Sequence, residues 1–164
     1  MQATDLATVL DWRNHPDVRQ MMFTSHEIGM PEHVAWFQTM GGDPQKHALI
    51  VEKGHQPVGF VGLSVDEQNV GDWGFYAAPY APRGTGVLLA IGALDYAFQI
   101  LALHKVCGRV LEFNKGSIRF HEKMKFTREG VLRAQHRIED TYFDVVCFGI
   151  LADEWREFRQ NLVR

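Results

Sequence analysis

The stretch FYAAPYAPRGTGVLLAIGAL, residues 75–94, decides the fold, because it joins an apolar segment to a long helical pattern through a loop rich in proline and glycine. The loop ends in Arg83, Gly84, Thr85 and Gly86. A helix that starts on glycines exposes its first backbone N–H groups, and its dipole adds partial positive charge there. The stretch predicts a cradle for a diphosphate. An isolated Arg-Gly-Thr-Gly is more often a plain tight turn, so the surrounding elements have to distinguish the two.

The residues after the loop predict a helix, a strand and a second helix. From Gly86 to Leu103 apolar residues recur every three or four positions, the spacing of one helical stripe. Lys105–Leu111 is a short apolar segment typical of a strand, and Asn114–Lys125 is an amphipathic helix. Together with the strand before the loop, this order predicts a parallel βαβ crossover.

The remaining segments predict an antiparallel meander, further helices and a closing hairpin. Strands are expected at His47–Lys53, Val58–Val65 and Val70–Ala77, with a four-residue turn from Gly54 to Pro57, and at Phe126–Arg133 and Tyr142–Leu151. Helices are expected as two short segments between Thr4 and Gln20, then from Pro31 to Gly42, and at Glu154–Val163. The expected fold class is α/β (α+β): one domain, residues 1–164, with a mixed central sheet flanked by helices.

The composition, 46% hydrophobic and 23% charged residues, is that of an ordinary soluble globular protein. A net charge of −3 gives no field that would gather nucleic acid, which favours a protein that acts on small molecules. The sequence lacks a long apolar run and a signal peptide, which predicts a cytoplasmic protein without membrane contact. Cys107 and Cys147 lie in apolar stretches and are expected to be core residues. The histidines lack the spacing of a zinc site, so no metal is expected.

The order of elements resembles the GNAT N-acetyltransferase superfamily, whose acetyl-CoA loop has the pattern Arg/Gln-x-x-Gly-x-Gly/Ala. That loop is matched by Arg83, Gly84, Thr85, Gly86 and Val87, with Leu88 where a small residue is usual. A second family motif is matched by Asn114, Ser117, His121, Glu122, Lys123 and Phe126, with Lys125 in place of a glycine. The resemblance covers nearly the whole chain. It implies a GNAT fold and direct transfer of an acetyl group from acetyl-CoA to a primary amine in a ternary complex.

The resemblance also implies which residues contact acetyl-CoA. They are Phe75, Tyr76 and Ala77 on the strand, Arg83, Gly84, Thr85, Gly86 and Val87 on the loop, and Asn114, Ser117, His121 and Lys123 on the second helix. His121 stands where many relatives have a tyrosine that protonates the leaving sulfur, and a histidine pKa of ~6.5 suits that task. The alternative is a helix-surface histidine that only hydrogen-bonds CoA or solvent. Asn114 is also a good helix N-cap.

The acceptor is expected to contact Arg13, His33, Trp36 and Trp73. A guanidinium suits a nucleotide-sugar diphosphate, although Arg13 could instead form an ion pair with Asp11 or Asp17. A water relayed to Asp72, Tyr76 or His33 could remove the amine proton, and the sequence does not choose among them.

Within the superfamily, WRNHP (residues 12–16), HVAWF (residues 33–37) and SIRFHEKMKF (residues 117–126) resemble the branch that serves pseudaminic acid biosynthesis. That resemblance implies acetylation of the 4-amino group of a UDP-linked 4-amino-4,6-dideoxy sugar. The same features resemble ribosomal-protein N-terminal acetyltransferases, so N-terminal and small-amine acceptors, and a non-catalytic acyl-CoA-binding module, stay open. Only Met1–Ala3 could supply the first family strand, and a homodimer could complete that sheet edge.

Overall fold

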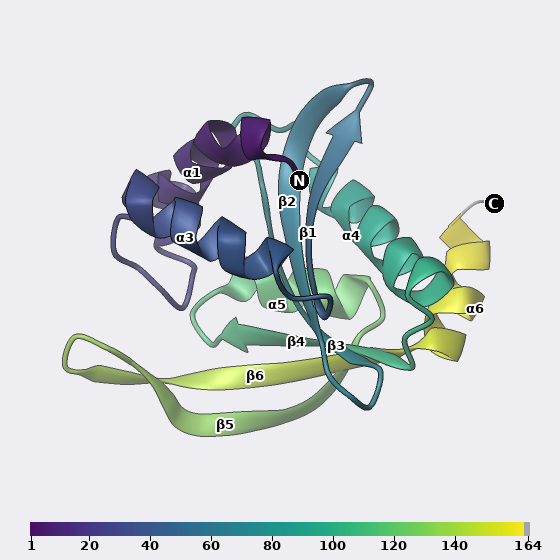
Figure 1. Ribbon diagram of the computed structural model, residues 1–164. Coiled ribbons are helices and arrows are strands. Elements are labelled where there is room, and N and C mark those ends of the chain that lie inside the picture. The colour runs from purple at the N-terminus through teal and green to yellow at the C-terminus, as the bar shows by residue number, and fades with distance from the viewer. Residues whose placement is uncertain (163–164) are drawn as a thin grey trace.

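A six-stranded mixed sheet forms the centre of the computed structural model, which describes residues 1–162 (Figure 1). The strand order is β1-β2-β3-β4-β6-β5, and β3 pairs with β4 in parallel while the other pairs are antiparallel. The strands are β1 (Lys46–Lys53), β2 (Gln56–Val65), β3 (Val70–Ala77), β4 (Lys105–Leu111), β5 (Thr127–Ile138) and β6 (Thr141–Leu151). The α-helices are α1 (Leu6–Asn14), α2 (Pro16–Arg19), α3 (Met30–Gly41), α4 (Thr85–Asp95), α5 (Lys115–Lys123) and α6 (Ala152–Leu162). The predicted fold class is confirmed.

The meander β1-β2-β3 carries a separate apolar cluster on each face, because successive side chains of a strand point to opposite sides. On β2, Val61 and Leu63 join the main core with Leu89 of α4, whereas Phe60 packs with Trp12 of α1 on the other side. Figure 1 shows α1 and α3 on one side of these strands and α4 on the other. The sheet therefore separates two helical layers.

The parallel pair β3–β4 opens partway along its length. Its register runs from Val70 with Lys105 to Trp73 with Gly108 and ends there, although β3 continues to Ala77 and β4 to Leu111. The unpaired halves of the two strands diverge into a gap, called the splay below. Both strands have the bounds that the sequence predicted.

Two boundaries in the middle of the chain differ from the prediction. Lys53 pairs with Gln56, so the β1–β2 turn has two residues, Gly54 and His55, both with positive φ. Such a turn follows the natural twist of a hairpin, and the predicted four-residue turn is wrong. The helix that starts at the loop ends at Asp95 and continues only as a π-helical turn, η2 (Tyr96–Ile100), rather than reaching Leu103.

The start of the chain agrees with a first family strand that is very short or missing, whereas the closing hairpin differs from the prediction. Among residues 1–162 no strand precedes β1, because Ala3–Asp5 form a 3₁₀ turn, η1. The hairpin β5–β6 is longer than predicted, since β5 extends past Arg133 with mostly exposed residues that blur its alternation. The predicted end of the last helix at Val163 lies outside the described residues. None of the helices within residues 1–162 combines the length and apolar character that a membrane span requires.

Candidate active site

A cavity of about 520 Å³ occupies the splay and receives side chains from both helical layers. From one layer come Asn114, Ser117 and His121 around α5, and from the other Trp36 and Met40 of α3. The strands contribute Asp72, Trp73, Gly74, Phe75, Tyr76, Arg109, Val110 and Leu111, and the segment after α2 contributes Met21, Met22 and Phe23. We call this space the splay cavity. A reactant on each side of the sheet could meet here.

The predicted phosphate loop lies at the start of α4, as the sequence indicates. Gly84 caps the helix with φ +92°, a left-handed conformation that favours glycine. The Thr85 hydroxyl donates to the carbonyl of Pro82 at 2.7 Å, which fixes the turn. A side chain at Gly86 would meet Phe120 of α5 at 3.1 Å, so a glycine here lets the two helices approach. The N–H groups of Thr85 and Val87 donate to the carbonyls of Pro82 and Gly84 at 3.2 and 3.0 Å, so a diphosphate at this helix start would rely on the remaining N–H groups and on the helix dipole.

A second, smaller cavity lies between α2 and α5 and shares Phe75, Asn114 and Ser117 with the splay cavity. Phe75, Tyr76 and Ala77 of β3 form one wall, and Asn114, Ser117 and Phe120 another. The Asn114 side chain accepts from the Ser117 backbone N–H at 3.0 Å, which makes Asn114 the N-cap of α5, as the sequence allowed. Lys123, at the far end of α5, is exposed and lies outside this cavity. The predicted contact of Lys123 with acetyl-CoA gains no support from its position.

His121 is buried, with 2% of its surface exposed, at the point where β3 and β4 separate. Its Nε2 accepts from the indole Nε1–H of Trp73 at 3.2 Å. Its Nδ1 lies 2.8 Å from the Ser117 carbonyl oxygen, which only accepts, so Nδ1 carries the hydrogen. Burial lowers the pKa of His121 below its ordinary value of 6.5. The ring is thus neutral with both nitrogens engaged, and this geometry does not support the predicted role as acid.

On the other side of the sheet, Arg13 and His33 lie together in a chamber of about 290 Å³. We call it the Arg13 chamber; it is lined by Arg13, Met22, Thr24, Ile28, Glu32, His33, Trp36, Phe60 and Tyr76. Arg13 is 8% exposed and forms no ion pair with Asp11 or Asp17, so the alternative drawn from the sequence is wrong. Its Nη2 donates to the Thr24 carbonyl at 2.5 Å, which removes half of the bidentate fork predicted for a diphosphate.

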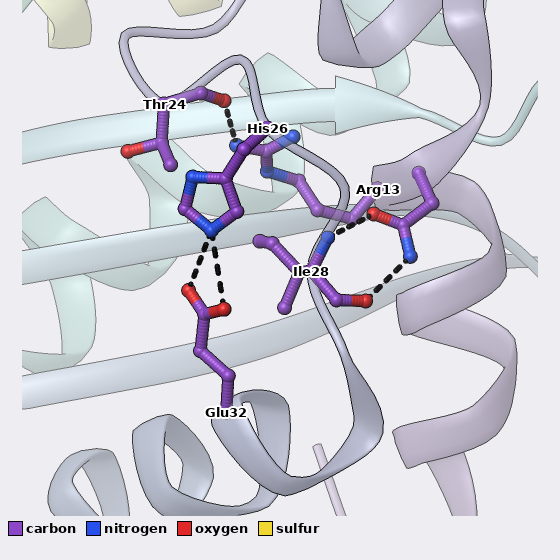
Figure 2. Close-up of polar contacts among 6 residues, drawn as sticks. Arg13, Thr24, His26, Ile28 and Glu32 are labelled. Atoms are coloured by element: carbon purple, nitrogen blue, oxygen red, sulfur yellow. Dashed lines mark hydrogen bonds and ion pairs between the residues drawn. The ribbon is translucent and has the colours of Figure 1, made fainter.

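The segment between α2 and α3 covers the chamber and is tied to both neighbouring helices (Figure 2). Asn14 of α1 holds Ile28 through two hydrogen bonds of 2.8 Å, one to its N–H and one to its carbonyl. His26 bonds the Glu32 carboxylate of α3 at 3.0 Å. These contacts position Met21 and Met22, which were not assigned to the site from the sequence because the segment has no periodic pattern.

The candidate bases also have defined surroundings. Asp72 receives a hydrogen bond from Arg109 at 2.5 Å across β3 and β4, a pair that the sequence did not predict. Burial raises the pKa of Tyr76 far above its ordinary value, so its phenol keeps its proton at neutral pH and does not serve as a base. His33 is 4% exposed and stacks on Trp36 with ring centroids 5.0 Å apart. Trp73 is core, 5% exposed, and forms the floor of the splay cavity.

Comparison with known families agrees with this geometry. A family model described as an acetyltransferase (GNAT) domain matches residues 1–127. The chain belongs to the GNAT acetyltransferase family. The predicted family, and with it the prediction of an enzyme, is confirmed. The motif residues Arg83 to Val87 and Asn114 to His121 therefore lie in a GNAT domain and around its splay.

Individual relatives are more distant. The SPbeta prophage-derived uncharacterized N-acetyltransferase YokL of Bacillus subtilis is 34% identical over 110 residues, which are 65% of this chain and 62% of that protein. The acetyltransferase PseH of Campylobacter jejuni is 27% identical over 127 residues, 77% of this chain and 80% of that one. The solved spermidine N-acetyltransferase from Vibrio cholerae, in complex with CoA and spermine, superposes with a TM-score of 0.87 at 24% identity, covering 95% of both chains. That likeness shows the fold.

Proposed function

We propose that this protein transfers an acetyl group from acetyl-CoA to the 4-amino group of a UDP-linked 4-amino-4,6-dideoxy sugar. The observation that carries the transfer is the splay cavity, which receives side chains from the acetyl-CoA side around α5 and from the opposite layer around α3. In this arrangement acetyl-CoA binds with its diphosphate at Gly84 to Val87 and its pantetheine between β3 and α5. The acceptor enters beside Trp36.

The chemistry requires little from the protein. The amine nitrogen attacks the thioester carbon, a C–N bond forms, the C–S bond breaks, and the proton lost by nitrogen ends on the CoA sulfur. Holding both reactants in one cavity supplies the main acceleration, because it turns a bimolecular reaction into a local one. Gly74 to Ala77 of β3 are unpaired on the β4 side, so their backbone groups are available to orient the thioester.

The nucleotide-sugar acceptor is supported by the similarity to the PseH relative and by the charges around the cavity. A polyamine needs free carboxylates to pair with its ammonium groups. Here the Asp72 carboxylate is bonded to Arg109 and the Glu32 carboxylate to His26, while Arg13 places a buried cation in the acceptor wall. These groups favour a neutral or anionic acceptor over a polycation such as the spermidine of the structural neighbour.

A thiol-release assay tests the proposal. Acetyl-CoA is offered with a UDP-4-amino-4,6-dideoxy sugar, with spermidine and with short N-terminal peptides, and we expect CoA release only with the sugar. Gly84→Ala serves as the matched variant, because a methyl group at φ +92° strains the loop backbone and should raise the KM for acetyl-CoA more than that for the sugar. Release with peptides alone would replace the sugar by an N-terminal acceptor. Acetyl-CoA binding without release from any amine would identify a non-catalytic module.

A further inference from the structure

The Arg13 chamber contains polar atoms that the protein itself leaves unpaired. Nη1 of Arg13 and Nε2 of His33 are buried and have no hydrogen-bond partner among residues 1–162. Native proteins pair nearly all of their buried polar atoms, since an unpaired one loses its water without compensation. Two such atoms in the wall of one cavity indicate that a ligand completes their bonding.

The two unpaired atoms require different hydrogen-bond partners. Arg13 Nη1 can only donate. Burial lowers the pKa of His33 below its ordinary value, so the ring is neutral at physiological pH. In the tautomer that carries its hydrogen on Nδ1, the unpaired Nε2 is an acceptor. The ligand therefore presents an acceptor to Arg13 and an N–H or O–H to His33.

The remaining walls exclude a strongly charged group. Glu32 lines the same chamber as Arg13, so one carboxylate offsets the one guanidinium and the chamber offers no net charge to an entering ion. Met22, Ile28, Trp36 and Phe60 make most of the other surface apolar. A chamber of about 290 Å³ has room for a substituent and not for a nucleotide. A small neutral group with a carbonyl, an N–H and an apolar part fits these constraints.

We infer that the Arg13 chamber binds an uncharged secondary amide of the acceptor, with Arg13 donating to the amide oxygen and His33 accepting from the amide N–H. The inference rests on the proposed function, because it names a part of the acceptor that the same site takes. Two sources carry such a group: the acylamino substituent of an amino sugar and the peptide bond next to a protein N-terminus. Both can reach the splay cavity, since it shares Met22, Trp36 and Tyr76 with the chamber.

Binding of two matched pairs, measured by calorimetry in the presence of CoA, tests the inference. The first pair is UDP-N-acetylglucosamine and UDP-glucose, which differ by an acetamido group in place of a hydroxyl. The second is glycylglycinamide and its ester analogue, which lacks the amide N–H. The amide member of one pair should bind at least about tenfold more tightly, as expected when a charged donor and a buried acceptor are both satisfied. The pair that shows this preference identifies the source.

Variants connect the preference to the two side chains. Arg13→Met and His33→Phe should each reduce it to about twofold or less, with CoA affinity unchanged, because each removes one partner of the amide. His33→Phe keeps an aromatic ring against Trp36, so it tests the inference even if Arg13→Met folds poorly. Arg19→Met is the matched control: it removes a nearby cation that pairs with Glu27 outside the chamber, and the preference should persist.

Two results would overturn the inference: equal affinity for both members of both pairs, or a preference that survives in Arg13→Met and His33→Phe with CoA binding intact. Thiol release is measured separately. A preference without release from any amine would remove the proposed function and leave the amide site standing. Release from an amine without a preference would remove the amide site alone.

Discussion

Two buried histidines flank the candidate site, and they differ in what their second ring nitrogen does. His121, where β3 and β4 separate, stacks on Phe148 at 4.9 Å and has both nitrogens bonded within the protein. His33, in the Arg13 chamber, stacks on Trp36 but leaves Nε2 without a partner among residues 1–162. A satisfied ring holds the structure together, whereas an unsatisfied one costs stability and is ready for a ligand. Burial alone therefore does not tell a structural histidine from a binding one.

Gly108→Ala should have the largest effect, because it disturbs the packing around His121. A Cβ at Gly108 would lie 2.5 Å from Nε2 of His121 and 2.8 Å from Nε1 of Trp73, and both rings are buried. We expect a loss of about 3 kcal/mol in the free energy of unfolding, as for overpacked cores. Gly74→Ala on β3 is the control, because its Cβ would meet nothing within 4 Å. Urea denaturation measures both variants, and equal costs would show that the contact is easily relieved.

His121→Phe should have the next largest effect, and on stability rather than on rate. Phenylalanine keeps the ring volume but leaves the indole N–H of Trp73 and the Ser117 carbonyl without their partner, which should cost about 2 kcal/mol. The turnover number should change by less than about threefold, since a general acid would contribute ~10²-fold or more. The control is His33→Phe, which should cost less stability because one nitrogen of His33 already lacks a partner.

One result would contradict a purely structural role for His121. If His121→Phe lowered kcat by two orders of magnitude with its unfolding free energy intact, His121 would act as the acid after all. Urea denaturation and the thiol-release assay, run on the same preparation, separate the two cases.

The sequence alone predicted those features that depend on residues close together in the chain. The bounds of β3 and β4 and the loop from Arg83 to Gly86 follow from apolar runs and glycines that lie side by side in the chain. The ring state of His121 could not be predicted, because it depends on Trp73, 48 positions earlier, and on the register that sets Trp73 opposite Gly108. A histidine in a helical motif looks the same whether its nitrogens face solvent or an indole.

The Arg13 chamber is a second feature that could be predicted only in part from the sequence. Arg13, His33 and Trp36 could be proposed as acceptor residues from short motifs in α1 and α3. Their missing partners, and the presence of Glu32 beside them, depend on how the segment after α2 folds back over both helices. That segment is held by Asn14 through its contacts with Ile28, a tie that no periodicity reveals.

The pH dependence of stability should test whether His121 is neutral in the folded protein. Burial holds the pKa of His121 below 6.5, so as pH falls the unfolded chain takes up this proton before the folded one does. Stability contributed by the neutral ring is complete above pH 6.5 and declines below it, by up to about 1.4 kcal/mol per pH unit until the folded pKa is reached. Urea titrations between about pH 7.5 and 5 should show a shallower slope in His121→Phe. Identical slopes would mean that His121 titrates normally in the folded protein.

Lys125→Gly should change the free energy of unfolding least among these variants, and it should stabilise the protein. Lys125 has φ +66° and follows α5 where the family motif has a glycine. In this cap the N–H of Phe126 bonds the His121 carbonyl at 3.0 Å, a Schellman arrangement that requires a left-handed residue between them. Relief of about 1 kcal/mol of strain, partly offset by the flexibility of glycine in the unfolded chain, should leave a gain of about 0.5 kcal/mol.

A thermal melt measures this gain as a rise of about 1–2 °C. Lys123→Gly is the matched control, since it removes an equally exposed lysine from the last turn of α5 and should lower the melting temperature instead. If Lys125→Gly instead had the lower melting temperature of the two variants, the lysine side chain, and not the backbone turn, would stabilise this end of the helix. The turn matters to the site because it returns Phe126 to stack on Trp73 at 5.2 Å, and Trp73 donates to Nε2 of His121. A substitution at an exposed position thus tests how firmly the buried pair is held.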